Sequence, residues 1–275
     1  MALHPTQLDL EEIAMNGPFG KNFRVSKRSQ QVRVSELPSS LDEVLKEYEK
    51  FLGQKVGILE KHNKLRGVSF VLSPLEIDRF IQLLPIFEDQ KEYTNNTGYF
   101  VTKLLANSYK DGVRDVTLNF VGIKPFCNLG DYFNGYSLIR DNKSLLGLNE
   151  DPLSLTIQGK VFSAFSEASY VHVVMDEDEG HSFYCASSFK VSVKRAGPFS
   201  FAAIRKAEVI VHDVNEPETL FQCGLGEYGD DIRPYNIQVK TPNLSLVKVF
   251  KDRISQIEKG ELYFIDPQGN EERVA

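Results

Sequence analysis

The middle of the chain reads SAFSEASYVHVVMD over residues 163–176, SFYCASSFKVSVKR over residues 182–195 and SFAAIRKAEVIVHD over residues 200–213. Each stretch has a serine, then small or aromatic residues, then a run rich in β-branched residues that is typical of a strand. The serines Ser163, Ser182 and Ser200 lie 19 and 18 residues apart. One further step forward reaches Thr219 and one step back reaches Ser144. We interpret this pattern as a tandem repeat.

A repeat of this length matches one coil of a β-solenoid, because helix pairs and propeller blades need roughly 33 residues or more. Coils that stack at about 4.8 Å satisfy each other's backbone groups and align equivalent side chains in ladders. Hexapeptide left-handed helices have coils of similar length, but stepping by six from Val171 reaches the charged Glu177. We therefore predict an α+β protein with an irregular, single-stranded β-solenoid of about six coils, each 18–19 residues long, at residues 113–240.

Two phases are open for the strands of this repeat, which we expect at residues 116–121, 136–139, 153–157, 170–175, 190–194 and 208–212. The first phase turns two ladders inward, namely His172, Val191 and Val209, and then Val174, Val193 and Val211. The second phase turns Val171, Val173 and Met175 inward and places His172 on the surface. The pattern alone does not choose between them.

Charged residues follow the same alignment. Lys190 and Glu208 are expected to stack outward on the strands, and opposite charges on neighbouring strands stabilise a sheet. In the first phase, Asp176, Arg195 and Asp213 form a ladder in the turn just past the strand ends. A groove with two carboxylates is the arrangement that glycoside hydrolysis requires. Candidate ligand-face residues are therefore Asp176, Arg195, Asp213 and His172.

The sequence on either side of the repeat has helical periodicity. Ser40 and Glu43 form a capping box before a predicted helix of about 20 residues, at 41–59. Ser73 and Glu76 form a second box, with Pro74 at the first helical position. Further helices are expected at 99–109 and after Asn243, the latter followed by a hairpin at 262–275.

Open solenoid ends need covering, because unpaired edge groups promote aggregation. We therefore divide the chain into a basic arm (1–38), a helical cap (39–112), the solenoid (113–240) and a C-terminal helix and hairpin cap (241–275). The arm is expected to be partly flexible, and its residues 17–35 carry five basic residues and no acid. A solvated tail or an arm laid on the acidic body, a nucleic-acid arm, and another partner-binding segment are the alternatives.

The composition, with 41% hydrophobic and 25% charged residues, indicates an ordinary globular chain rather than a disordered one. A net charge of -6 disfavours nucleic-acid binding. No apolar run is long enough to cross a membrane and no signal peptide is recognisable, which predicts a cytoplasmic protein. Three cysteines, Cys127, Cys185 and Cys223, without a CxxC pair fit a reducing compartment.

Motifs for chemistry are sparse. The acidic stretch DEDEGHSFYC at 176–185 lacks EF-hand spacing and is expected to be a solvated loop. The histidines His4, His62, His172, His181 and His212 form no short metal pair, and no GxSxG motif is present. Cys185 aligns with small residues and is expected to be a buried thiol. GLGEYG at 224–229 lacks the strand and helix of a nucleotide site, so we predict no catalytic residue, metal or cofactor.

LGDYFNG at 129–135, the short strands that follow, and Gly159, Gly180 and Gly197 in the turns after strands resemble the GXGXG-type β-helix over residues 113–226. This module occurs in the large subunit of glutamate synthase and in a subunit of formylmethanofuran dehydrogenase. The resemblance implies a structural role, in which the module packs against and positions catalytic parts.

Two functions are consistent with this sequence. The first is a non-catalytic assembly module that binds a protein partner or self-associates, and the alternative is a carbohydrate-binding or carbohydrate-active protein that uses the Asp176, Arg195 and Asp213 face. Exposed aromatic rings along that face favour the carbohydrate function, whereas an exposed apolar patch on a helical cap favours assembly. The identity of any small-molecule or glycan ligand is not predicted.

Overall fold

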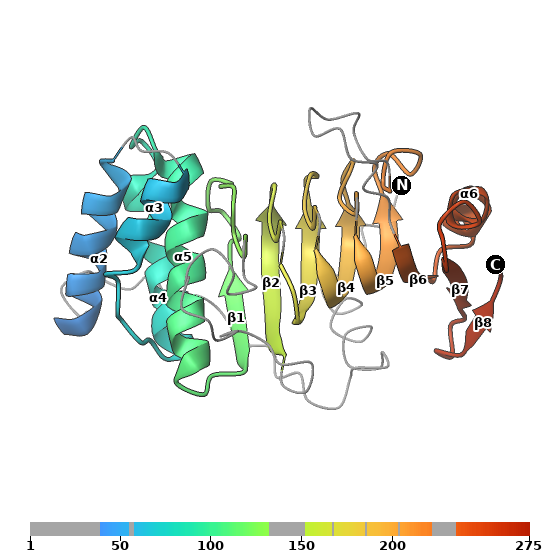
Figure 1. The fold of residues 1–275 in the computed structure, drawn as a ribbon, viewed down its shortest axis with the longest axis horizontal. Coiled ribbons are helices and arrows are strands. Elements are labelled where there is room, and N and C mark those ends of the chain that lie inside the picture. The colour runs from blue at the N-terminus through green and yellow to red at the C-terminus, as the bar shows by residue number, and fades with distance from the viewer. Residues whose placement is uncertain are drawn as a thin grey trace, which may run out of the picture.

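A computed structural model describes residues 39–54, 58–131, 152–166, 168–184, 186–202, 204–221 and 235–275, without the side chains of residues 39, 40, 58, 59 and 62. The molecule is an elongated α+β protein in which most helices lie at one end of a mostly parallel eight-stranded sheet and one helix lies near the other end (Figure 1). Several predicted features lie outside the described residues, namely the arm 1–38, the strand 136–139, Cys185, Cys223, residues 224–229 and the Ser40 side chain.

The helical end contains α2 (Ser39–Leu52), α3 (Ile58–Leu65), α4 (Pro74–Leu83), the 3-10 helix η2 (Leu84–Phe87) and α5 (Tyr93–Lys110). The single helix predicted at 41–59 is wrong, because α2 ends at Leu52 and Gly53 follows it. Glycine is about 1 kcal/mol worse than alanine inside a helix, which favours an end there. The capping box of Ser73 and Glu76 is confirmed.

Helix α5 begins at Tyr93, six residues before the predicted start at Tyr99. Its first turns are polar, which hid the helical periodicity, yet Asn96 and Thr97 are buried. The Thr97 hydroxyl lies 2.6 Å from the Tyr48 hydroxyl on α2, and Asn96 donates to the Phe51 carbonyl. Tertiary hydrogen bonds therefore allow polar residues to face the core.

The sheet runs in chain order and is not closed into a barrel. Its strands are β1 (Asp115–Asn119), β2 (Leu153–Val161), β3 (Val171–Asp178), β4 (Ser187–Ala196), β5 (Arg205–Val214), β6 (Tyr235–Thr241), β7 (Glu261–Ile265) and β8 (Glu271–Arg273). Every neighbouring pair from β1 to β7 is parallel, and β7 and β8 form an antiparallel hairpin. Strand β6, which we did not predict, carries buried Ile237 and Val239 between exposed or half-buried neighbours.

The register decides the phase of the strands. Leu155, Val173, Val191 and Val209 pair in succession, each 18 residues after the previous one. The second phase is confirmed, because Val171, Val173 and Met175 are buried while His172 is half-buried on the other face. The first phase, with His172 and Val174 inward, is wrong because it followed the 19-residue spacing from Ser163 to Ser182. A shift of one residue moves every side chain to the opposite face.

The segments that connect the strands also pair with each other. The Ser163 amide donates to the Gly180 carbonyl and the His181 amide donates to the Pro198 carbonyl, both at 3.0 Å. Positive φ angles recur at equivalent points, such as Ser163, His181 and Phe199 at 48°, 57° and 56°. Successive connections are therefore hydrogen-bonded to each other at these points.

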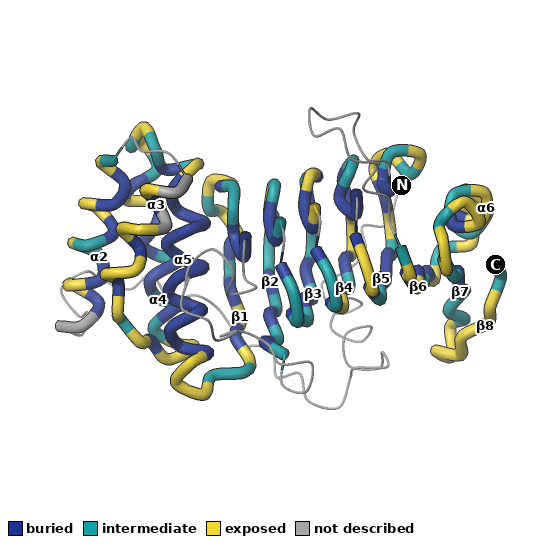
Figure 2. The backbone as a smooth tube through the Cα atoms, viewed as in Figure 1, coloured by how far each residue is buried: buried dark blue, intermediate teal, exposed yellow. Residues whose placement is uncertain are grey.

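The core is one cluster of buried residues that extends from the helical end through the strands and their connections (Figure 2). Phe165, Phe183 and Phe201 stand in a row across it, with ring centroids 5.2 Å and 5.5 Å apart. All three side chains are at most 1% exposed. The three rings come from the connections that follow β2, β3 and β4, so the row links these connections through the core.

The two ends of the sheet differ. Helix α4 packs against β1 at the helical end. At the other end, α6 (Leu244–Ile254) begins at the N-cap Asn243 and leads to the β7–β8 hairpin, whose turn at Asp266–Gly269 is as predicted. This hairpin extends the same sheet through the parallel pairing of β6 with β7.

Candidate ligand-binding surface

The predicted residues Asp176, Arg195 and Asp213 do not form one ladder. Arg195 pairs with Glu177 on β3 and with Asp213 on β5, and its guanidinium lies 3.6 Å from the Asp213 carboxylate. Asp176 lies one position earlier, where its carboxylate is 2.6 Å from the Lys194 ammonium and accepts from the Gly159 amide. The predicted ladder with Asp176 is wrong for the same reason as the strand phase.

Ion pairs engage the carboxylates around Arg195. Glu177 lies 3.3 Å from Lys160 and 4.0 Å from Arg195, so its charge is shared between two cations. These opposite charges link neighbouring strands of the sheet.

His172 lies elsewhere, in a ladder with Lys190, Glu208 and Gln238. The stacking of Lys190 on Glu208 is confirmed by an ion pair of 2.9 Å. Burial lowers the pKa of His172, and the nearby Lys190 lowers it further, while Glu208 opposes this effect. His172 is consequently neutral at neutral pH.

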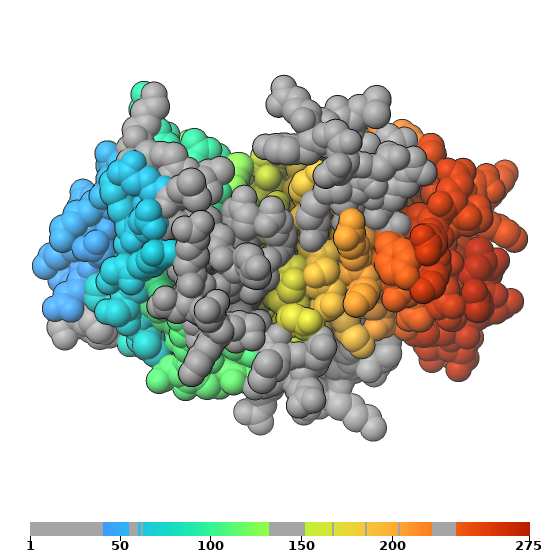
Figure 3. Space-filling model, viewed as in Figure 1, coloured from blue at the N-terminus to red at the C-terminus, as the bar shows by residue number. Residues whose placement is uncertain are grey.

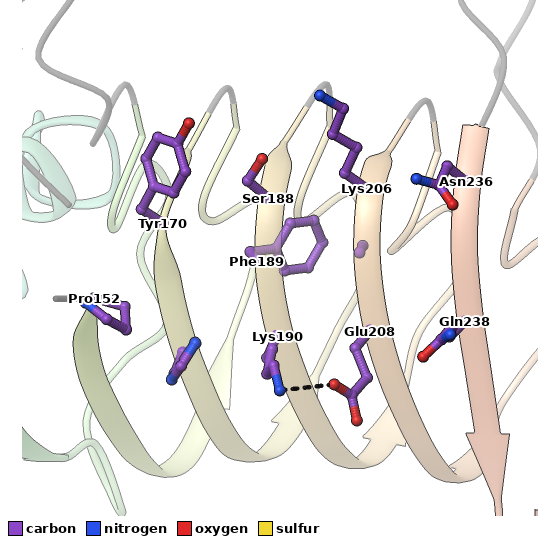
Figure 4. Close-up of a pocket in the computed structure, with 11 residues that line it drawn as sticks. Pro152, Tyr170, Ser188, Phe189, Lys190, Lys206, Glu208, Asn236 and Gln238 are labelled. Carbon is purple, nitrogen blue, oxygen red and sulfur yellow. Dashed lines mark ion pairs between the residues drawn. The ribbon is translucent and has the colours of Figure 1, made fainter. Parts of the chain in front are cut away.

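An open groove of about 370 Å³ runs along this ladder, across β3 to β6 (Figure 4). One wall is the ladder itself, and Tyr170, Ser188, Lys206 and Asn236 line the other edge. Their φ angles are 56°, 53°, 50° and 53°, so the backbone turns identically at each strand start. The buried Phe189 and Ala207 lie between the two rows and form the floor.

Glu208 is the acid of this groove, and two lysines neutralise it. Its carboxylate lies 2.9 Å from Lys190 and 2.9 Å from Lys240. Burial alone would raise its pKa, but the hydrogen bonds and charges of Lys240 and Lys190 outweigh burial and hold the pKa below its usual value. Glu208 therefore remains ionised and paired, which suits a wall of a binding site more than a catalytic acid.

Lys206 differs from Lys190, because it is exposed and has no ion-pair partner among the residues that the structure describes. The prediction of site residues missed Lys206, Tyr170 and Asn236. Tyr170, Ser188 and Lys206 are spaced by 18 residues, so this spacing was a usable signal.

The acidic stretch at 176–185 is not a solvated loop throughout, because Asp178 is fully buried at the end of β3. Its Oδ1 accepts from the Ser182 hydroxyl at 2.7 Å and from the Gly180 amide at 3.0 Å. Its Oδ2 has no hydrogen-bond partner in the described structure, since the nearby Ser200 hydroxyl donates to the Gly197 carbonyl. Burial raises the pKa of Asp178, although the hydrogen bonds from the Ser182 hydroxyl and the Gly180 amide oppose the rise.

Aromatic rings at the turns after the strands lie against one another. His181 stacks on Phe199 with centroids 5.2 Å apart and an interplanar angle of 23°, and Phe162 meets His181 edge-on at 6.2 Å. These rings therefore contact one another at successive turns of the chain.

Comparisons with protein-family models, curated proteins and solved structures gave no match for this chain. Within the described ranges, no three His, Cys, Asp or Glu side chains lie close enough together to hold a metal ion. None of the helices described is long and apolar enough to cross a membrane.

Proposed function

We propose that this chain is a non-catalytic assembly module, a scaffold or subunit that binds another protein through its helical end. In this proposal the sheet and its connections form a β-solenoid, as the GXGXG-type resemblance implies, and the protein is cytoplasmic. The 18-residue pairing of β2 to β5 and the pairing between connections support the solenoid.

The observation that carries the proposal is a set of exposed aliphatic side chains around α4 and the end of β1. Leu75, Ile86 and Val121 are 60%, 62% and 65% exposed, and Val71 is 49% exposed. Gln82 donates to the Asn119 carbonyl, and the Lys124 amide donates to the Glu88 side chain. These hydrogen bonds connect the segment around Ile86 to the segment around Val121. Several exposed aliphatic side chains at one end of a molecule are typical of an interface with an apolar protein surface.

The carbohydrate function on the Asp176, Arg195 and Asp213 face has weaker support. Asp176 is paired with Lys194 rather than aligned with Arg195 and Asp213, so the expected ladder of charged side chains is not formed. The column of Lys160, Glu177, Arg195 and Asp213 instead links strands β2 to β5 by opposite charges, as expected of a framework.

The test isolates the full chain from its native cells and determines the intact mass of the complex. We expect a stoichiometric protein partner, or a second copy of the chain, that is lost in the double variant Leu75→Asp, Ile86→Asp. The control is the double variant Leu244→Asp, Val249→Asp, which adds the same charge at exposed positions of α6. A monomer without a partner, or equal loss in both variants, would contradict the proposal.

A further inference from the structure

The groove along β3 to β6 offers a repeating set of polar groups. Each strand contributes one residue to the edge (Tyr170, Ser188, Lys206, Asn236) and one to the ladder (His172, Lys190, Glu208, Gln238). Neighbouring strands lie about 4.8 Å apart, so both rows repeat at that distance across the strands. A ligand that lies along the groove meets the same two kinds of wall at every strand.

This repeat distance suits a chain of sugar rings better than a peptide. An extended peptide advances about 3.3 Å per residue and falls out of step with the strands. A chain of linked pyranose rings advances farther per ring than a peptide does per residue, and so comes closer to the strand spacing. The hydroxyls of Tyr170 and Ser188 and the amides of Asn236 and Gln238 are the groups that bond to sugar hydroxyls.

The charge of the groove selects an acidic ligand. The lining contains two lysines and one glutamate, in a chain with a net charge of -6. Glu208 is neutralised by Lys190 and Lys240, and His172 is neutral, which leaves the exposed Lys206 to attract an anion. The Lys206 side chain rises from the same edge of the groove as Ser188 and Asn236 (Figure 4).

We propose that this groove binds a short acidic oligosaccharide, with a uronate carboxylate on Lys206 and the sugar hydroxyls on the flanking polar side chains. The site is separate from the exposed aliphatic surface of the helical end, and its occupation does not depend on the assembly function. In the space-filling view of Figure 3, the coloured surface of these middle strands is partly visible.

The experiment titrates the full chain with trigalacturonate in a calorimeter at low salt. Lys206→Asn should weaken binding about fivefold, the effect of one exposed charge-assisted contact. Asparagine tolerates the positive φ of position 206, so the variant should fold. Arg205→Asn is the matched control, because it removes the same charge at the adjacent exposed position, which does not line the groove.

Two further probes decide the ligand class. Maltotriose, a neutral trimer, should bind at least fivefold more weakly than trigalacturonate, and triglutamate should bind no better than maltotriose. Asn236→Asp, which places a negative charge beside Lys206 and keeps a residue suited to positive φ, should weaken trigalacturonate binding further than Lys206→Asn does. Absent binding, equal loss in the Lys206 and Arg205 variants, or preference for triglutamate would each overturn the proposal.

Discussion

At the scale of single residues, the carboxyl of Asp178 is an internal link of the turn after β3. It accepts from Gly180 and Ser182, and the Ser182 hydroxyl in turn accepts from the Ala164 amide at 3.1 Å. One oxygen, Oδ2, has no described partner. An ionised carboxylate here is costly because the hydrogen bonds only partly replace water.

We expect Asp178→Asn to reduce the pH dependence of stability. Burial raises the pKa of Asp178 in the folded state, so its contribution to the free energy of unfolding is largest at acid pH and falls as the pH rises from about 3.9 through the folded-state pKa. Asparagine cannot ionise, so this fall should disappear. The free energy of unfolding is measured by urea denaturation at pH values between 3 and 8, about one per pH unit.

The control for this prediction is Asp252→Asn, at an exposed position of α6. It removes the same formal charge without touching a buried group. If both variants keep the pH profile of the parent chain, Asp178 does not carry the buried-charge cost.

At the scale of elements, local hydrogen bonds set where helices begin. The Ser73 hydroxyl accepts from the Glu76 amide at 3.3 Å, and the Glu76 carboxylate accepts from the Ser73 amide at 2.8 Å. Pro74 adds a fixed φ at the first helical position. These contacts span three residues, so the printed sequence was enough to predict them.

Ser73→Ala should lower the free energy of unfolding by about 1 kcal/mol, because α4 loses its N-cap. Ser73→Thr should stay close to the parent, since its hydroxyl can accept from the Glu76 amide and donate to the Glu76 carboxylate as serine does. Both are measured by urea denaturation. A loss in Ser73→Thr as large as in Ser73→Ala would contradict a capping role for the hydroxyl.

At the scale of the whole molecule, the row of Phe165, Phe183 and Phe201 continues to Phe221, 6.0 Å from Phe201, and then to Phe250 on α6 at 5.7 Å. The row therefore connects the middle of the sheet to the C-terminal helix. Rings in such contact contribute about 0.5–1.5 kcal/mol per pair beyond the burial of their area.

We expect Phe183→Ala to lower the free energy of unfolding by about 3–5 kcal/mol, because it opens a cavity in the middle of the row. Phe183→Leu should cost less, since it keeps most of the volume. Denaturant unfolding followed by far-ultraviolet circular dichroism measures both. Equal losses in the two variants would mean that the ring contacts, and not the filled volume, stabilise this region.

Sequence patterns predicted the features that depend on neighbours along the chain. The strands near 153–157, 170–175, 190–194 and 208–212, the cap at Ser73, the turn at 266–269 and the α+β class all follow from spacing, capping residues and turn residues. The alternation of Ile237 and Val239 with polar residues was also a usable signal for β6. The outward pairing of Lys190 with Glu208 was predicted correctly.

Only the tertiary structure decided how these pieces align. The strand phase depends on whether the offset between neighbours is 18 or 19 residues, and both numbers occur between the serines. Pairing selects 18 because it buries Val171, Val173 and Met175 and leaves the polar His172 half-exposed. The burial of Asp178, the start of α5 and the two walls of the groove follow from contacts between residues distant in the chain, which local patterns do not contain.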